Sequence, residues 1–159
     1  MSFATADLYD QNEGKVQVAT PLFFDYGGQR SFSGPISTVK AYEDNSLVRA
    51  ALEESGHGRV LVVDGGGSLR CALVGDMLAQ LGQKNGWAGM VVYGCIRDSA
   101  TIAQIPIGLK ALNTNPKKSV KKGVGERDVP VNFAGVDFVP GYFLYADPDG
   151  ILVSENKLA

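Results

Sequence analysis

An aspartate and an arginine–aspartate pair, separated by twenty residues, are the side chains of this chain best suited to chemistry. Asp76 precedes the segment 77–96, and Arg97 and Asp98 follow it. The pattern between them is that of a helix, a turn at Asn85-Gly86 and a buried strand, so a helix start and a strand end can meet. One guanidinium and two carboxylates would then lie where a divalent metal ion and a small anionic substrate can bind.

Each of these residues also has a purely structural explanation. Asp76 can cap a helix and interact with its macrodipole, and Arg97 with Asp98 can form an exposed ion pair that contributes little to stability. Two arguments favour function. The carboxyl ends of parallel strands are where α/β folds bind ligands, and the backbone N–H groups of residues 75–78 would form an anion site at the helix N-terminus.

The elements that must position these residues are predicted from hydrophobic patterns and turn signals. The continuous apolar runs at 59–64 and 90–93 predict strands that are covered on both faces. Between them, Gly75-Asp76 is expected to open a helix that Asn85-Gly86 ends. The second strand then delivers Arg97 and Asp98 at its carboxyl end.

The remaining elements are predicted from similar signals. In chain order they are a helix over 6–10 capped by Thr5, a strand over 33–41, a helix that Asn45 or Ser46 caps and Gly56 closes, a strand over 71–74, a helix around 99–104 and a strand over 107–112. From Val129 onward, short strands alternate with turns. We therefore expect an α/β fold, a single domain over 1–159 with a β-rich C-terminal third.

Composition and charge indicate an ordinary globular protein. The 159 residues fit one domain, and 45% of them are hydrophobic and 20% charged. The net charge of -2 argues against direct nucleic-acid binding, and no apolar run reaches the ~18 residues of a membrane span. With no signal-peptide pattern at the start, Cys71 and Cys95 are expected to be reduced and the protein to be cytoplasmic.

Other motifs fail at a defining residue. The turn at 65–67 lacks the last glycine of a dinucleotide fingerprint, because Arg70 stands in its place. His57 is the only histidine and accompanies no nucleophile motif, and a zinc site would require more His and Cys. The turn at 147–150 lacks the ligand spacing of a calcium loop. The lysines of 117–122 are expected on a solvated loop, with anion steering or partner binding as the alternative.

Glycine-rich landmarks around the Asp76 and Arg97-Asp98 positions closely resemble those of a known family. They are Asp64-Gly65-Gly66-Gly67-Ser68-Leu69-Arg70, Gly75-Asp76-Met77-Leu78-Ala79, Asn85-Gly86-Trp87-Ala88-Gly89 and Gly94-Cys95-Ile96-Arg97-Asp98. On these residues the chain resembles the RraA-like family, which includes regulators of ribonuclease E activity and class II 4-hydroxy-4-methyl-2-oxoglutarate aldolases. The resemblance covers nearly the whole chain. It implies a swivelling β/β/α domain in a homotrimeric ring with sites between subunits.

The resemblance also implies a role for each candidate residue. A substrate carboxylate would be bound by the backbone N–H groups of Gly75, Asp76, Met77 and Leu78. Arg97 would contact the 2-oxo acid and stabilise developing enolate charge, while Asp76 would orient a water that shuttles the proton. Asp98 would hold a divalent metal ion, directly or through water, and such carboxylate and water ligands suit Mg²⁺ or Mn²⁺.

Two functions are consistent with this resemblance. The first is a metal-dependent lyase that releases pyruvate from 4-hydroxy-4-methyl-2-oxoglutarate or oxaloacetate, since both reactions pass through pyruvate enolate. The alternative is a non-catalytic regulator that binds and inhibits a ribonuclease E-type endonuclease. A menaquinone-pathway methyltransferase is rejected, because the only candidate cofactor loop is the failed glycine pattern at Gly65. In longer aldolases of the family an acidic residue near the C-terminus reaches the neighbouring subunit's metal site, and Glu155 is the only acid near this C-terminus.

Overall fold

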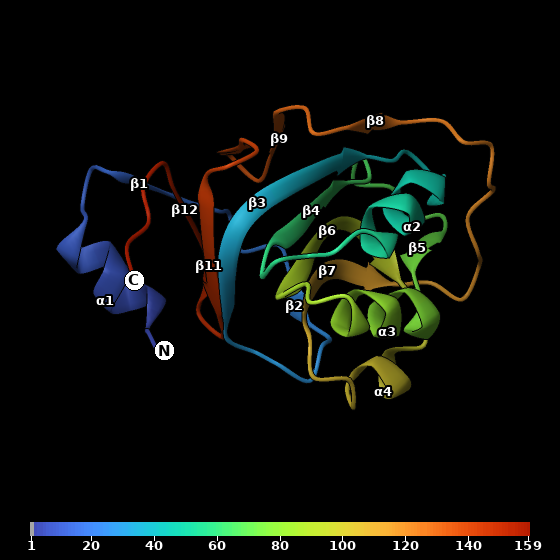
Figure 1. The fold of residues 1–159 in the computed structure, drawn as a ribbon, viewed down its shortest axis with the longest axis horizontal. Coiled ribbons are helices and arrows are strands. Elements are labelled where there is room, and N and C mark those ends of the chain that lie inside the picture. Colours follow the sequence, from blue (N-terminus) through green and yellow to red (C-terminus); the bar gives the residue numbers. More distant parts are fainter. Residues whose placement is uncertain (1) are drawn as a thin grey trace.

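A parallel sheet forms the centre of the molecule, which we describe over residues 2–159 from a computed structural model. Its strands lie side by side in the order β3 (Phe32–Lys40), β4 (Val60–Asp64), β6 (Gly89–Ile96) and β7 (Gly108–Thr114) (Figure 1). The apolar runs of β4 and β6 are buried on both faces, as predicted for strands inside an α/β sheet.

Shorter strands extend this sheet to ten strands. Next to β3 come three antiparallel strands, β11 (Phe143–Asp147), β12 (Gly150–Ser154) and β1 (Val16–Val18). Three pieces pair with single strands: β2 (Phe24–Asp25) with β7, β5 (Ala72–Val74) with β6, and β8 (Glu126–Arg127) with β3. A separate hairpin is formed by β9 (Val131–Phe133) and β10 (Val136–Phe138).

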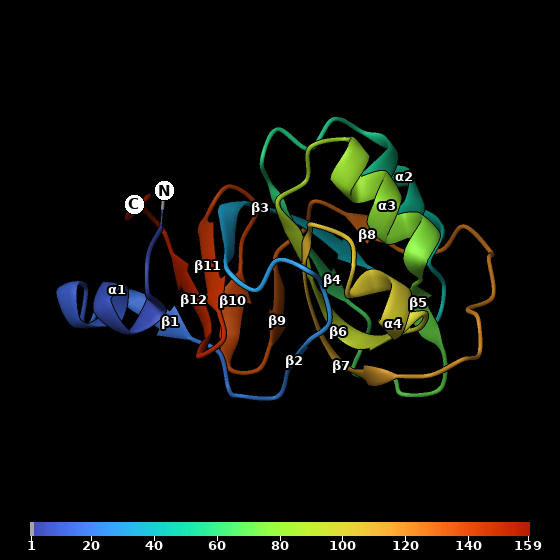
Figure 2. The same ribbon diagram turned by 90° about the horizontal axis from the view of Figure 1, so that it is seen from below.

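The helices are divided between the two ends of the molecule. Three of them lie together over the parallel strands: α2 (Ser46–Glu53), α3 (Asp76–Lys84) and α4 (Ser99–Ile102) (Figure 2). The fourth, α1 (Thr5–Gln11), lies at the other end beside β11 and β12, close to both chain termini (Figures 1 and 2). Within residues 2–159, no helix combines the length and the apolar character that crossing a bilayer requires.

The core around the parallel strands has two parts because neighbouring residues of β4 point to opposite faces. Leu61 and Val63 pack toward the helices, with buried residues of α2 and α3. Val60 and Val62 pack toward the other face, against the hairpin side chains and β11 and β12. The layers are therefore strands, parallel sheet and helices, which confirms the α/β prediction and its β/β/α order with a strand-rich C-terminal third.

Several boundaries differ from the sequence prediction. Thr5 is the first residue of α1 rather than its cap, because its side chain bonds Asp147. Gly56 does not close α2, which ends at Glu53. Instead, a Cβ at Gly56 would collide with the backbone of Trp87, so glycine permits that close approach.

Three strands were not predicted from the sequence. They are β1, β2 and β8, and each has only two or three residues. Such pieces are too short to show alternation, so only their pairing with a longer strand defines them. The expected strand over 107–112 is β7, and the Asn85-Gly86 turn ends α3 with Gly86 at a φ of 82°.

The buried carboxylate of Asp147, at the end of β11, binds the first residue of α1 through hydrogen bonds. Asp147 accepts the Thr5 backbone N–H at 2.8 Å and the Thr5 hydroxyl at 2.6 Å. Burial alone would raise the pKa of Asp147, but the hydrogen bonds from Thr5 and from the backbone at Asp149 and Gly150 hold that pKa below its ordinary value. The ionised form is therefore the one that the fold stabilises.

Asp147→Asn is expected to lower the free energy of unfolding at neutral pH by about 1.5–3 kcal/mol, the range for hydrogen bonds to a charged group. Because the folded state lowers this pKa, the stabilisation exists above the unfolded value near 4 and is lost as the pH falls below it. Urea unfolding of both proteins at several pH values measures the difference, with Asp10→Asn as an exposed control on α1. A difference that stays constant down to low pH would contradict this explanation.

Candidate active site

The ends of β5 and β6 bring the predicted site residues together. Val74 pairs with Ile96 in a parallel register, and the Arg97 N–H donates to the Val74 carbonyl at 2.9 Å. The chain therefore leaves both strands at the same edge, as Gly75 after β5 and as Arg97-Asp98 after β6. The twenty-residue spacing is thus the length of α3, its turn and β6.

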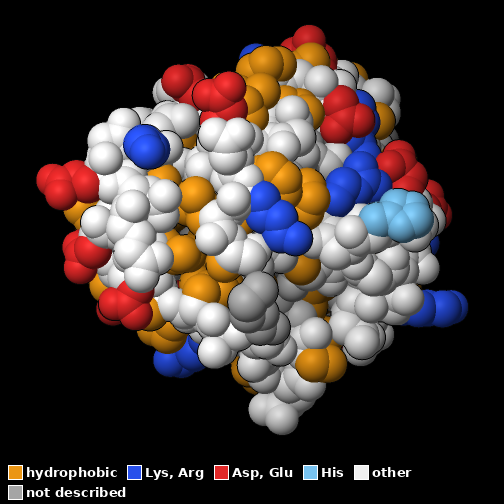
Figure 3. Space-filling view, turned by 60° about the vertical axis from the view of Figure 1, so that its left-hand side comes forward, with side chains coloured by type: hydrophobic (Ala, Val, Ile, Leu, Met, Phe, Trp, Pro, Cys, Tyr) orange, Lys and Arg blue, Asp and Glu red, His pale blue; other side chains and the backbone are white. Residues whose placement is uncertain are grey.

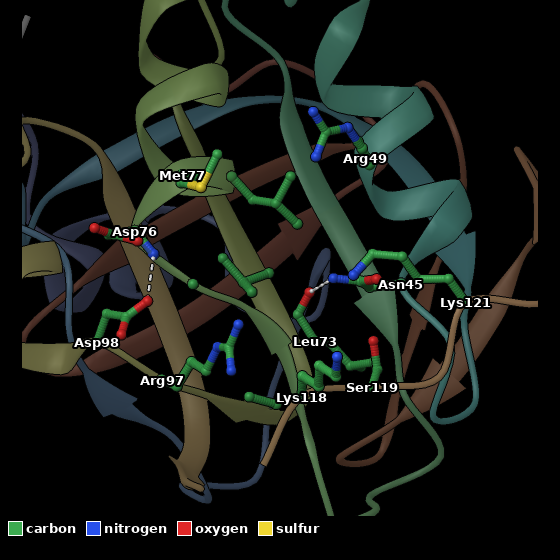
Figure 4. A pocket seen from close by; sticks show the side chains of 14 residues that line it. Asn45, Arg49, Leu73, Asp76, Met77, Arg97, Asp98, Lys118, Ser119 and Lys121 are labelled. Atoms are coloured by element: carbon green, nitrogen blue, oxygen red, sulfur yellow. Dashed lines mark hydrogen bonds between the residues drawn. The ribbon is translucent and has the colours of Figure 1, made fainter. Parts of the chain in front are cut away.

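The N-terminus of α3 is bridged to the Asp98 carboxylate. The Asp76 N–H donates to Asp98 Oδ2 at 3.1 Å (Figure 4). The first N–H groups of a helix have no intrahelical acceptor, which leaves those of Met77 and Leu78 for a ligand. Of the N–H groups predicted to bind an anion, that of Asp76 already donates to Asp98 and is not free for a ligand.

Two backbone features allow this contact. A Cβ at Gly75 would lie 2.8 Å from Asp98 Oδ2, so a glycine lets the carboxylate approach the helix start. Asp98 itself has a φ of 59° and a ψ of 38°, the left-handed region that aspartate tolerates better than most residues. This turn directs the chain from β6 into α4 and places the Asp98 side chain beside α3.

Arg97 does not form the ion pair that a structural explanation would require. Among residues 2–159, no carboxylate lies within the 4.0 Å that defines a salt bridge to its guanidinium. Its Nη1 donates only a long bond of 3.4 Å to the Pro116 carbonyl. Figure 4 shows the guanidinium extending into the space between α3 and the loop after β7. Asp76 is not the N-cap of α3 either, because the cap residue is Gly75.

These residues line one cavity of about 110 Å³. A single water needs roughly 10–15 Å³ measured this way, so the cavity suits a small organic acid rather than a nucleotide. One wall comprises all the residues predicted from the sequence: Gly75, Asp76, Met77, Leu78, Arg97 and Asp98. The structure therefore brings together the whole predicted set.

The opposite wall was not predicted as part of a site. It comprises Asn45 and Arg49 at the start of α2 and Lys118, Ser119 and Lys121 on the loop after β7 (Figure 4). The only signal for it in the sequence was the lysine cluster over 117–122. Nothing in the sequence placed that cluster opposite Arg97.

The donor set fits a metal ion that retains most of its water. Asp76 and Asp98 are the two carboxylates in the cavity, and the part of the chain described contains no cluster of three His, Cys, Asp or Glu residues that could enclose a metal. Mg²⁺ is commonly held by one or two carboxylates together with water and substrate oxygens. The chemistry of the cavity therefore suits Mg²⁺ or Mn²⁺ and does not suit zinc.

The rejected motifs lie outside this cavity. At Gly66 and Gly67, which have φ values of 69° and 73°, an added Cβ would meet the rings of Tyr42 and Tyr93. This turn therefore packs against aromatic side chains. The single histidine is exposed, and Figure 3 shows it at the surface in pale blue, on a face where acidic and basic side chains are interspersed.

The two cysteines are buried and free, and burial raises the pKa of both thiols. A raised pKa keeps a thiol protonated and makes it a poor nucleophile. Neither cysteine lines the cavity.

Comparison with known proteins identifies relatives over nearly the whole chain. The model of the RraA-like family, described as Aldolase/RraA, matches residues 5–153. A protein of Alkalilimnicola ehrlichii, provisionally named 4-hydroxy-4-methyl-2-oxoglutarate aldolase, is 63% identical over 99% of this chain and 98% of its own length. A protein of Aromatoleum aromaticum with the same provisional name is 60% identical over 99% of both chains.

Two solved structures have nearly the same fold. One, described as an S-adenosylmethionine: 2-dimethylmenaquinone methyltransferase from Geobacillus kaustophilus, is 53% identical, with a TM-score of 0.96 over 98% of this chain and 97% of its own. The other, described as the RNA-processing inhibitor RraA from Thermus thermophilis, is 46% identical, with a TM-score of 0.96 over 100% of this chain and 96% of its own. The fold is thus shared by proteins with three different descriptions.

Gly75→Ala is expected to displace the Asp98 carboxylate from the Asp76 N–H, because the new methyl group would occupy its position. The methyl group meets the end of a side chain that can rotate, so the free energy of unfolding should change by less than about 1 kcal/mol. The amide resonance of Asp76 in a ¹H–¹⁵N NMR spectrum reports the contact, and Asp98→Ala should move it in the same direction. An unchanged Asp76 resonance in Gly75→Ala would show that glycine is not needed for this contact.

Proposed function

Because the chain belongs to the RraA-like family of aldolases and RraA proteins, we propose that it is a carbon–carbon lyase that releases pyruvate from 2-oxo acids. The substrates that we propose are 4-hydroxy-4-methyl-2-oxoglutarate and oxaloacetate. Relatives at 60–63% identity carry the provisional aldolase name and match this chain over 98–99% of their own length. The provisional aldolase name has therefore been given to proteins of about the same length as this chain.

One observation carries the proposal: free N–H groups, an unpaired arginine and two carboxylates line the same small cavity. A 2-oxo acid has a carboxylate, an adjacent carbonyl oxygen and a reacting carbon in fixed order. The N-terminus of α3 offers the N–H groups of Met77 and Leu78 to the carboxylate. Arg97, with no acidic partner among the described residues, can donate to the 2-oxo oxygen.

The same geometry supports the bond-breaking step. When the C3–C4 bond breaks, its electron pair moves toward the C2 carbonyl and forms the enolate of pyruvate. Arg97 would stabilise the negative charge that develops on the C2 oxygen. In the aldol substrate, the proton of the 4-hydroxyl group leaves and a proton is added at C3, and Asp76 would orient the water that carries it. In oxaloacetate, carbon dioxide leaves instead.

Asp98 would hold a divalent cation, Mg²⁺ or Mn²⁺, directly or through water. Its Oδ2 accepts the Asp76 N–H, so the carboxylate is oriented from the helix while its other oxygen is not involved in that bond. A cation bound there supplies Lewis acidity toward the oxygens of a 2-oxo acid.

We also propose that the protein assembles as a homotrimer and acts in the cytoplasm. Glu155 directly follows β12, which lies at the end of the sheet away from α3 (Figure 1). Glu155 is exposed there, so any contribution to a metal site would be to the site of a neighbouring subunit. That arrangement would place the cavity near a subunit boundary.

A second function is supported by the neighbour described as an RNA-processing inhibitor, which has a TM-score of 0.96. If this chain is instead a regulator, it should bind a ribonuclease E-type endonuclease at micromolar concentration and slow RNA cleavage without metal-dependent lyase activity. Pull-down and cleavage assays with the purified endonuclease test this. Lack of binding at that concentration removes the basis for the regulatory function.

Arg97→Ala is expected to lower kcat/KM for pyruvate release by about 10²–10³-fold, the loss typical of removing one donor to a developing oxyanion. Asp98→Ala and EDTA should each abolish activity, and Mg²⁺ should restore it only in the protein that retains Asp98. A coupled assay for pyruvate with oxaloacetate and 4-hydroxy-4-methyl-2-oxoglutarate provides the measurement. Arg30→Ala, an exposed arginine outside the cavity, is the matched control. Full metal-dependent activity in both Arg97→Ala and Asp98→Ala would refute the assignment of this site.

A further inference from the structure

The opposite wall of the cavity is built from two parts of the chain that are distant in sequence. One part is the start of α2, with Asn45 and Arg49, and the other is the loop after β7, with Lys118, Ser119 and Lys121. No helix or strand lies in that loop between β7 and β8. Contacts outside regular structure must therefore hold the two parts of this wall together.

The loop has almost no buried side chains to hold it. Between residues 116 and 125, Ser119 alone is buried, at 5% exposure. The apolar residues Val120 and Val124 are 58% and 63% exposed. Burial of apolar surface, which usually fixes a segment against its neighbours, therefore contributes little here. The position of the loop depends on hydrogen bonds instead.

Asp44 joins the two parts of the wall. From the α2 side its carboxylate accepts the Ser46 N–H at 2.9 Å and the Ser46 hydroxyl at 2.6 Å. From the loop it accepts the N–H groups of Lys122 at 2.8 Å and Val124 at 3.1 Å. The Ser46 hydroxyl in turn accepts the Gly123 N–H at 3.2 Å. Three consecutive N–H groups of the loop are thus bound by Asp44 or by the hydroxyl that donates to it.

This network requires a carboxylate. Asp44 is only 4% exposed, and burial alone would raise its pKa, but the hydrogen bonds from Ser46, Val124 and Lys122 keep that pKa far below its ordinary value. Its Oδ1 accepts both bonds from Ser46, and its Oδ2 accepts both bonds from the loop. An asparagine would turn an NH₂ group toward one of these two pairs of donors. Only the ionised acid can therefore bind both parts of the wall at once.

Each part of the wall also carries a buried polar atom that lacks a hydrogen-bond partner among residues 2–159. On the α2 side it is Asn45 Oδ1, and on the loop it is the Ser119 hydroxyl. Both residues line the cavity (Figure 4). The Asn45 amide is oriented by its Nδ2, which donates to the Leu73 carbonyl at 3.0 Å. Buried polar groups are rarely left unpaired, so these two atoms are placed to contact a ligand.

We propose that Asp44 is a positioning residue, which holds the start of α2 and the loop after β7 in the arrangement that a bound substrate contacts. The proposal rests on the proposed function, because it takes the reaction centre to be Arg97, Asp98 and the N-terminus of α3. Those groups are carried by other elements than the ones that Asp44 joins. A substrate that fills a cavity of about 110 Å³ touches both walls. Loss of Asp44 should therefore weaken substrate binding and leave the chemical step nearly unchanged.

Limited digestion with trypsin measures the position of the loop without reference to activity. The sites after Lys118 and Lys122 lie in the segment that Asp44 holds. Asp44→Asn is expected to raise the cleavage rate there at least about tenfold, because that rate follows the population of the open loop and hydrogen bonds to a charged group are lost. Ser46→Ala removes one donor to Asp44 and the acceptor of the loop N–H, so it should raise the rate less.

Asp147→Asn is the matched control. It disrupts a similarly buried carboxylate network at the other end of the molecule, so it separates release of the loop from a general loss of stability. Its cleavage rate at the two loop sites should equal that of the native protein.

Pyruvate release from oxaloacetate with Mg²⁺ gives the second measurement. In Asp44→Asn, KM should rise about tenfold and kcat should change less than about twofold, the pattern of lost binding that substrate and transition state share. Asp147→Asn should keep both native constants. Ser46→Ala should raise KM by a smaller factor, and it carries the test if Asp44→Asn does not fold.

The proposal is overturned if Asp44→Asn is cleaved at the native rate, if Asp147→Asn accelerates cleavage of the loop equally, or if a released loop leaves KM unchanged. A loss of kcat at constant KM would also overturn it. Failure of the proposed function has a different signature: the native protein releases no pyruvate, whereas Asp44→Asn still accelerates cleavage of the loop.

Discussion

The candidate site depends on the parallel pairing of the short strand β5 with β6. Val74 lies opposite Ile96, and the Arg97 N–H bonds the Val74 carbonyl at 2.9 Å. Because β5 has only three residues, its position is defined by the longer, largely buried strand beside it. That pairing determines where α3 begins and makes Arg97 and Asp98 leave the sheet at the same edge. A shift of the β5 register would separate the helix N-terminus from both side chains.

The two walls of the cavity have different structural origins. One wall consists of a helix start and a strand end, both anchored on a sheet that packs against side chains on its two faces. The other wall is a loop, and loops carry variable side chains at low cost to the core. Asp44 compensates for the absence of regular structure by binding two backbone N–H groups of that loop. A wall fixed by the sheet and a wall formed by a loop are thereby combined around one cavity.

Elements with long or continuous apolar patterns were predicted correctly, whereas the two- or three-residue strands β1, β2 and β8 were not. The strands β4 and β6 and the helix α3 are recognisable because burial on both faces or one face leaves a pattern in consecutive residues. Thr5 resembled a helix cap, but its hydroxyl bonds Asp147, 142 residues away. A local signal cannot indicate whether a side chain will find a more favourable partner elsewhere in the fold.

The sequence by itself determined the first half of the site. The spacing of Asp76 from Arg97 and Asp98, together with a helix and a buried strand between them, was enough to place three side chains at one edge. Only the tertiary structure decided that Asp98 accepts the Asp76 N–H and that, among residues 2–159, Arg97 forms no ion pair and the Ser119 hydroxyl opposite it is unpaired. The reason is physical. The periodicity of a sequence shows which residues of one element are buried, whereas the packing of separate elements determines which side chains face one another across a cavity.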